Sequence, residues 1–211
     1  MRKKHHKSLR PTGDASARWE RLSATPASVT WYDITANGNN GTANSATLYS
    51  DFLFDGISST VSTTLEAPLL PATNTWTLQA WATRLGAGTL AATRSGNNGW
   101  ALRDSPAGGD IEFTSFPFSA NLAVVPVTVG WFHLALVWTP GAPASLQSYI
   151  NGVLHVTVAP SDYGAVGQPL VIGSGTAGFY SGKIDTVRVY ARALSSDEIL
   201  RDYNAGKAAH L

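Results

Sequence analysis

The chain has 211 residues, a formal net charge of +1 and no cysteine. A chain of this length can bury the core of one large β domain, because sandwiches and barrels of this size fold as single units. The lack of cysteine excludes disulfides and thiolate metal sites. No apolar run approaches the roughly 18 residues that predict a membrane-spanning helix, so we expect no membrane insertion.

The first 26 residues are strongly basic. They hold seven Lys or Arg against two acids, whereas the rest of the chain holds eight against twelve, so an arm of charge +5 precedes a body of charge −4. No apolar segment follows the basic residues, so we expect no secretory signal and a protein made in the cytoplasm. The sequence therefore divides into an arm at 1–26 and a body at 27–211.

A basic arm on an acidic body attracts acidic surfaces. One interpretation is a solubilising tail. The other is an element that docks on neighbouring protein subunits in an assembly, and its anchors would be Arg2, Lys3, Lys4, Lys7, Arg10 and Trp19. Nucleic acid is a weaker partner, because the run is short and no aromatic residues are interleaved with its charges.

Short strand-like runs follow one another from residue 27 to about residue 193. Residues 76–83 alternate, which predicts a strand with Trp76, Leu78, Ala80 and Ala82 on one side. Residues 131–139 are apolar on both faces, as expected of a central strand covered on both sides. Strands at this spacing, with no helical period between them, predict an antiparallel sandwich.

Two dipeptides predict tight hairpins. Asn151-Gly152 lies between two strand-like runs and favours positive φ at both turn positions. Asp55-Gly56 predicts a second hairpin, between the runs at 52–54 and 60–63, by the same argument.

One short helix is predicted over residues 195–205. Ser195 and Glu198 form an S-x-x-E capping box, and Gly206 is expected to end the helix. Three residues, Leu194, Ile199 and Tyr203, give the helix a docking stripe. We therefore expect it to clasp the sandwich.

Several motifs occur in a fixed order along the body. They are the loop DITANGNNG at 33–41, FDG at 54–56, the strand at 76–82, WFHLALV at 131–137, YING at 149–152, LVIG at 170–173 and the closing strand and helix at 182–199. Together, over about residues 27–205, they resemble the laminin-G-like (concanavalin A-like lectin/glucanase) superfamily. The resemblance implies an all-β fold of two antiparallel sheets in jelly-roll topology. That fold hosts lectins, glycosidases, adhesive modules and virion proteins, so it does not fix the function.

The sequence predicts no catalytic residues. Glucanases that the chain resembles carry Glu-x-Asp-x-Glu on one strand, and that motif is absent. The nearest acid pair, Asp110 and Glu112, is interpreted as a solvated strand end. Residues 173–178 spell GSGTAG, but a strand follows where the dinucleotide fingerprint needs a helix. His133 lies inside an apolar strand and is interpreted as structural.

Asp185 is the candidate for a metal site. It shares strand parity with Val187 and Val189, which predicts an inward carboxylate that needs a partner. Hydrogen-bond donors are one such partner. The other is a structural Ca²⁺, which many members of the superfamily that the chain resembles hold with an Asp near this place. Asp33 and Asp55 would then supply further oxygen ligands.

The opposite strand parity predicts a polar face with aromatic side chains. Its members are Gln79, Trp81, Gln147, Tyr149, Arg188 and Tyr190. Aromatic planes beside amides and a guanidinium suit sugar stacking and protein contacts. The alternative is packing beneath the helix or the arm, for Trp81 above all.

The sequence favours a non-catalytic structural or interaction protein. In its most concrete form this is a virion-associated component, a phage capsid decoration or tail protein, whose arm docks on neighbouring subunits and whose sandwich is displayed. The alternative is a lectin-like carbohydrate-binding module that contacts a cell-surface glycan. A glycosidase or lyase is disfavoured, because its carboxylates are missing.

Overall fold

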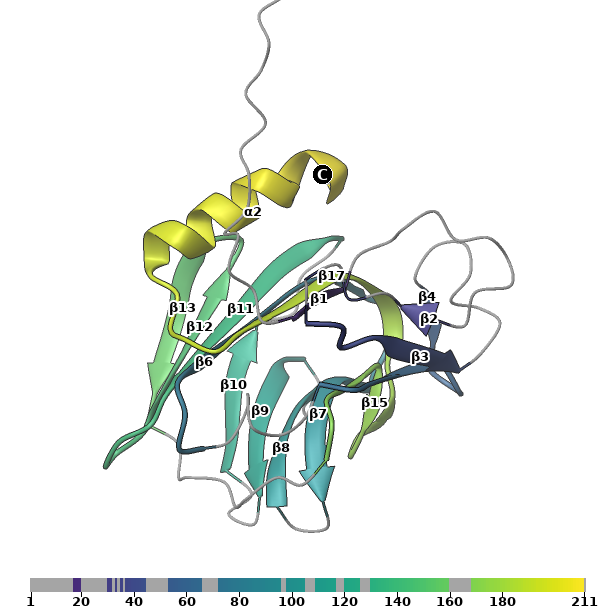
Figure 1. Cartoon of the computed structure of the whole chain (residues 1–211), viewed down its shortest axis with the longest axis horizontal. Helices are drawn as coiled ribbons and strands as arrows, with labels where there is room; N and C mark the ends of the chain where they lie inside the picture. The colour runs from purple at the N-terminus through teal and green to yellow at the C-terminus, as the bar shows by residue number, and fades with distance from the viewer. Residues whose placement is uncertain are drawn as a thin grey trace, which may run out of the picture.

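The structure is a computed structural model of the chain. It describes residues 17–19, 30–31, 33, 35, 37–44, 53–65, 72–95, 98–104, 109–116, 120–125, 130–159 and 168–210. Two sheets face each other, and one helix near the C-terminus lies across the outer face of one of them (Figure 1). This is the all-β sandwich with a C-terminal helix that the sequence predicts.

The first sheet, sheet A, has seven strands. Its order is β1-β17-β6-β11-β12-β13, and β4 also pairs with β17. The strands are β1 (Ala17–Trp19), β4 (Leu53–Asp55), β6 (Trp76–Arg84), β11 (Phe132–Thr139), β12 (Ser145–Ile150), β13 (Val153–Val158) and β17 (Ser181–Tyr190). The predicted central strand is confirmed, because β11 lies between β6 and β12 and is buried along seven of its eight residues.

The second sheet, sheet B, has ten strands. Its order is β10-β9-β8-β7-β14-β5-β3-β2, and β15 and β16 form a small hairpin beside β7. The strands are β2 (Thr30–Trp31), β3 (Gly41–Asn44), β5 (Thr60–Thr63), β7 (Thr89–Ser95), β8 (Asn98–Asp104), β9 (Ile111–Phe116), β10 (Ala120–Val125), β14 (Val171–Ile172), β15 (Ser174–Gly175) and β16 (Gly178–Phe179).

The core lies between the two sheets and includes the apolar side of β6 that its alternation predicts. Trp76 of β6 stacks on Trp100 of β8, with ring centroids 5.4 Å apart, and on Trp138 of β11 at 6.2 Å. Because Trp100 belongs to sheet B and the other two to sheet A, the indoles join the two layers. All three are fully buried.

The hairpin at Asn151-Gly152 is confirmed. The two residues join β12 to β13 with φ of 50° and 80°, the positive values that a two-residue turn of this type needs. The Asn151 backbone N–H donates to the carbonyl of His133 over 2.8 Å, and its side-chain Oδ1 accepts from the His133 N–H over 2.9 Å. The turn is therefore tied to the central strand β11.

The predicted hairpin at Asp55-Gly56 is wrong. The strands on either side do not pair with each other, because β4 joins sheet A and β5 joins sheet B. The Asp55 carboxylate accepts hydrogen bonds from the backbone N–H groups of residues 57, 58 and 59, each 2.9 Å long. The turn therefore carries the chain from one sheet to the other.

The helix α2 (Ser196–His210) is longer than predicted. Its capping box forms as expected, but Gly206 lies inside the helix and does not end it. A Cβ at Gly206 would lie 2.9 Å from Cε2 of Trp81, closer than real Cβ atoms come to a ring. Gly206 is therefore needed for close approach to sheet A. Among the described residues, no helix has the length and apolar character to cross a membrane.

Sheet A also takes in a part of the predicted arm. Residues 17–19 form β1, which pairs antiparallel with β17, so that Ala17 lies opposite Val189 and Trp19 opposite Val187. The sheet therefore extends further toward the N-terminus than the predicted boundary at residue 26.

Replacing Gly206 with alanine is expected to destabilise the protein by about 1–3 kcal/mol, because the added methyl group would overlap the indole of Trp81. At an ordinary exposed helix position the same replacement stabilises by about 0.5–1 kcal/mol. The sign of the change in the free energy of unfolding therefore distinguishes a packed Gly206 from an exposed one. The measurement is the free energy of unfolding in urea. The matched control is Asn204→Ala, an exposed position of the same helix, which should change stability little. A Gly206→Ala variant as stable as the native protein would contradict the close packing.

Candidate functional site

The predicted ligand face lies on the outer side of sheet A, where α2 covers it. Trp81 and Tyr190 are fully buried, Gln79 and Arg188 are 1% and 3% exposed, and Tyr149 is 5% exposed. Gln147 is half-buried. Sheet register brings these side chains together in neighbouring rows. This face is therefore buried beneath the helix, which was the alternative to a ligand-binding face. No open surface remains around Trp81.

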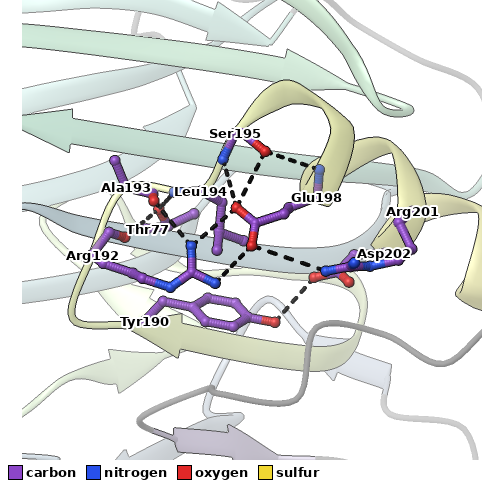
Figure 2. Close-up of polar contacts among 9 residues, drawn as sticks. All are labelled: Thr77, Tyr190, Arg192, Ala193, Leu194, Ser195, Glu198, Arg201 and Asp202. Atoms are coloured by element: carbon purple, nitrogen blue, oxygen red, sulfur yellow. Dashed lines mark hydrogen bonds and ion pairs between the residues drawn. The ribbon is translucent and has the colours of Figure 1, made fainter.

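The first turn of α2 is held by a polar cluster at the end of β17 (Figure 2). Arg192 donates two hydrogen bonds to the Glu198 carboxylate, over 2.8 and 3.0 Å. The same carboxylate accepts from the Ser195 backbone N–H over 2.9 Å. The bonds from Arg192 and Ser195 lower the pKa of Glu198 to about 2 against the opposing effect of burial. Next to this cluster, the Tyr190 hydroxyl donates a hydrogen bond to the buried Asp202 carboxylate over 3.0 Å.

The last turns of α2 pack on Trp81. The rings of Tyr203 and His210 stack on its indole, with centroids 5.5 and 4.3 Å away. His210 Nε2 lies 2.9 Å from Oδ2 of Asp185. Sequence reasoning missed His210, because it ended the helix at Gly206, and it missed Asp202, because it assigned only Leu194, Ile199 and Tyr203 to the docking stripe of the predicted helix. The spacing 199, 202, 203, 206 and 210 follows one face of a longer helix and could have indicated them.

Asp185 does not share a face with Val187 and Val189, contrary to the parity argument. The register of β17 against β6 shifts between Asp185 and Arg188, where Thr186 adopts φ of 49°. This bulge adds one residue, so Asp185 falls opposite Trp81, on the helix side of the sheet. Its carboxylate finds hydrogen-bond partners there, His210 and the Thr186 hydroxyl.

The three carboxylates of the predicted calcium site are engaged in separate places. Asp33 accepts hydrogen bonds from the backbone N–H groups of Thr35 and Asn39, each over 2.9 Å. Burial acts to raise the pKa of Asp55, but its three backbone donors outweigh it and hold that pKa well below the usual range. Among the described residues no three His, Cys, Asp or Glu side chains gather as metal ligands would. These residues do not fit one shared cation.

His133 has the surroundings of a structural histidine. It is fully buried, and its Nε2 lies 3.2 Å from Gln79 Oε1. Burial, with the neighbouring charges of Arg188 and His210, lowers the pKa of His133 to about 3, so the ring is neutral.

The acid pair and the glycine-rich run both lie in or beside strands of sheet B. Glu112 lies in β9 opposite Arg103 of β8, and Asp110 precedes that strand. The glycine-rich run at 173–178 contains β15 and turns into β16, with no helix after it.

Of the predicted docking arm, five residues lie outside the described part of the chain. They are Arg2, Lys3, Lys4, Lys7 and Arg10. The sixth, Trp19, ends the edge strand β1, for which the structure describes the backbone. Docking through this segment stays a prediction.

The outer face of sheet B carries a pocket of about 370 Å³. It lies over β14, which is only two residues long and sits between the longer strands β5 and β7. Ser62, Val171 and Ala92 lie side by side across these three strands and line its base. The other lining residues are Thr63, Gln168, Pro169, Ser174 and Gly175.

The lining residues of this pocket that the structure describes are uncharged. Together these residues combine three hydroxyl groups and one amide with small apolar groups, and none of them is a carboxylate or a basic side chain. Such a surface can exchange hydrogen bonds with a neutral polar ligand and contact its C–H groups. It cannot supply the acid pair that glycoside hydrolysis requires. Sequence reasoning missed this pocket, because its residues are distant in the sequence and individually ordinary.

A protein-family model described as the concanavalin A-like lectin/glucanases superfamily matches residues 54–200, more than half of the chain. No curated protein matches the sequence significantly.

Solved structures share the fold at low sequence identity. The botulinum neurotoxin serotype D binding domain is similar with a TM-score of 0.68 at 14% identity, covering 90% of this chain and 51% of that one. The binding domain of Paraclostridial Mosquitocidal Protein 1 gives 0.65 at 13%, covering 91% and 52%. This chain thus spans about half the length of these toxin domains. Domain 4 of AbnA, a GH43 extracellular arabinanase from Geobacillus stearothermophilus, in complex with arabinotriose, gives 0.55 at 16%, covering 87% and 85%.

Stability is expected not to depend on calcium, because the carboxylates of Asp33, Asp55 and Asp185 already have protein partners. The melting temperature should be the same in excess calcium and in excess chelator. A site filled at a hundredfold excess over its Kd would add about 2.7 kcal/mol to the free energy of unfolding. A melting temperature raised by calcium and lowered by chelator would contradict this assignment.

Proposed function

The chain belongs to the concanavalin A-like lectin/glucanase superfamily, and on this basis we propose that it is a non-catalytic module that binds carbohydrate. The site we assign is the pocket on the outer face of sheet B. The observation that carries the proposal is the uncharged, hydroxyl- and amide-bearing lining of that pocket.

The chemistry of the lining suits a neutral sugar. A sugar presents hydroxyl groups at its rim and C–H groups on its faces. Ser62, Ser174 and Gln168 can exchange hydrogen bonds with the hydroxyls, while Ala92 and Val171 can contact the C–H groups. The volume of about 370 Å³ lies within the usual range for small-ligand sites. A charged ligand would lose its hydration there without gaining an opposite charge.

The similar structures support a binding role. One is a domain of an arabinanase solved in complex with arabinotriose, and the match spans 85% of that domain. Others are the binding domains of clostridial toxins, one of them described as a receptor binding domain. The identities are below 20%, so these likenesses support the class of function and leave the ligand to the chemistry of the pocket.

The absence of catalysis is part of the proposal. Neither Asp110 nor Glu112 lines the pocket, and Glu112 lies opposite Arg103 in the sheet. The described residues around the pocket therefore offer no acid and base pair across a bound sugar.

Binding is expected to depend on the pocket and not on salt. The intact chain would be screened against neutral oligosaccharides, arabinotriose among them, and the best ligand titrated by calorimetry. Ser62→Phe fills the pocket, and Gln168→Ala removes its amide. We expect each to weaken binding by about tenfold or more, since a lost hydrogen bond or a steric block costs about 1.4 kcal/mol or more. Affinity should not change with salt, because the lining is uncharged.

The matched control is Thr157→Phe, an exposed position on β13 of sheet A, which should bind normally. The proposal fails if no neutral oligosaccharide binds, or if Ser62→Phe and Thr157→Phe bind equally well.

The assembly role predicted for the basic arm remains a second candidate, and only the charge asymmetry of the sequence favours it. An arm of charge +5 and a body of charge −4 suit contacts between copies. Deleting residues 1–16 keeps β1 in place. The shortened protein should stay folded but lose any self-association that sedimentation detects for the full chain at low salt, and raised salt should weaken that association. Equal association with and without the arm would remove this role.

A further inference from the structure

Two short segments border the pocket on sheet B along the strand direction. Residues 168–169 lie just before β14 and residues 174–175 just after it, and both pairs line the pocket. Because β14 has only two residues, the two segments approach Val171 from opposite ends of this strand. A ligand in the pocket is therefore confined along the direction of the strands.

Both bordering segments are fixed to β7. The Thr93 hydroxyl donates a hydrogen bond to the backbone carbonyl of Gln168 over 2.8 Å. On the other border, the Ala177 backbone N–H donates to the Thr89 hydroxyl over 3.0 Å. A Cβ added at Gly175 would lie 2.6 Å from Cγ2 of Thr89, closer than real Cβ atoms come to another atom. These contacts hold the two borders in place beside β7.

Outward-facing side chains form one row across sheet B at the level of the pocket. Residues next to them in the chain, such as Val61 and Ile172, belong to the core between the sheets, so the row faces away from that core. In order from β3 to β9, the members that sheet register places side by side are Thr42, Ser62, Val171, Ala92, Ala101 and Thr114.

The two ends of this row differ in their access to solvent. Ala101 of β8 and Thr114 of β9 are only 0% and 1% exposed. Arg103, two residues further along β8, donates from its Nε to the Thr114 hydroxyl over 2.9 Å and so lies against this end of the row. At the other end, Thr42 and Ser62 are exposed. The pocket is therefore closed toward β8 and open toward β5 and β3.

We infer, on the basis of the proposed sugar-binding function, that the pocket holds one end of a linear neutral oligosaccharide whose next units cross β5 and β3. Ala92 on β7 and Thr42 on β3 are three strand spacings apart, about 14 Å at about 4.8 Å per spacing. This path is longer than a single sugar ring. The hydroxyl groups of Ser62 and Thr42 lie along it and can exchange hydrogen bonds with the sugar hydroxyls.

The closed end of the row selects a chain end over an internal stretch of a polysaccharide. A chain bound by its middle needs an exit on both sides of the pocket. The covered side chains of Ala101 and Thr114 block the exit toward β8, and the two bordering segments block movement along the strands. None of the six residues of the row is charged, so a neutral chain crosses β5 and β3 without an unpaired charge beside it.

Chain length is the first measurement, and it uses the full chain. The probes are arabinose and arabinotriose, with glucose and xylose series of the same lengths, titrated by calorimetry. The trisaccharide of a series that binds should bind about tenfold more tightly than its monosaccharide, because units over β5 and β3 add hydrogen bonds. Thr42→Phe should remove this gain and leave the affinity for the monosaccharide unchanged, since Thr42 lies beyond the pocket.

Two further variants separate this exit from the pocket itself. Thr157→Phe, at an exposed position on β13 of sheet A, is the matched control and should keep the full gain with chain length. Ser62→Phe should weaken the binding of both the monosaccharide and the trisaccharide, because it fills the pocket.

The direction of the bound chain is the second measurement, and it needs no variant. The trisaccharide carries a bulky fluorophore at either its reducing or its non-reducing end. One label should leave the affinity unchanged, because it projects over β3. The other should lower the affinity about tenfold or more, because that end of the sugar lies against the covered end of the row.

Equal affinity for the monosaccharide and the trisaccharide would overturn the inference. So would two labels that are both tolerated or both rejected, because the pocket would then have two exits or none. In each of these cases, weaker binding by Ser62→Phe would still support the pocket as a sugar site. If no sugar of the panel binds, the proposed function and this inference fail together.

Discussion

The contact between α2 and the outer face of sheet A is the constraint on which the arrangement of this molecule depends. That face bears Trp81, Gln79 and Arg188, which would form an open aromatic and polar surface without the helix. The helix begins at the capping box of Ser195 and ends over Trp81, and Gly206 allows its backbone to reach the indole. The two ends of the helix are therefore held by different contacts, an ion pair and a capping box at the start and aromatic stacking at the end.

Covering sheet A leaves the outer face of sheet B to meet other molecules. The base of the pocket on that face is made of small side chains such as Ser62 and Ala92, and the short strand β14 leaves a hollow between its longer neighbours. A ligand there would contact a rigid sheet joined to the core through the tryptophan stack, so binding requires little ordering of the protein. This arrangement suits a recognition surface, since rigid elements hold polar groups in fixed positions.

The sequence predicted the sandwich well where side-chain pattern and backbone geometry agree. The alternation of 76–83 and the positive φ at Asn151-Gly152 depend on local physics, and both predictions are confirmed. The predictions failed where tertiary contacts override local signals. Asp55-Gly56 links two sheets, the bulge at Thr186 reverses the parity of Asp185, and Gly206 faces an indole instead of ending a helix. The pocket on sheet B could not be predicted from the sequence, because its residues come from strands that only the sheet order brings together.

The two outer faces of the sandwich are physically separate. The pocket lies on the outer side of sheet B, and α2 covers the outer side of sheet A, with the buried tryptophan stack between the layers. The end of α2 contacts Trp81 and Asp185, and neither residue lines the pocket. A densely packed core transmits little change unless it has two arrangements, and the stacked indoles show one. Substitutions beneath the helix should therefore leave sugar binding at sheet B unchanged, and each face can be altered without the other.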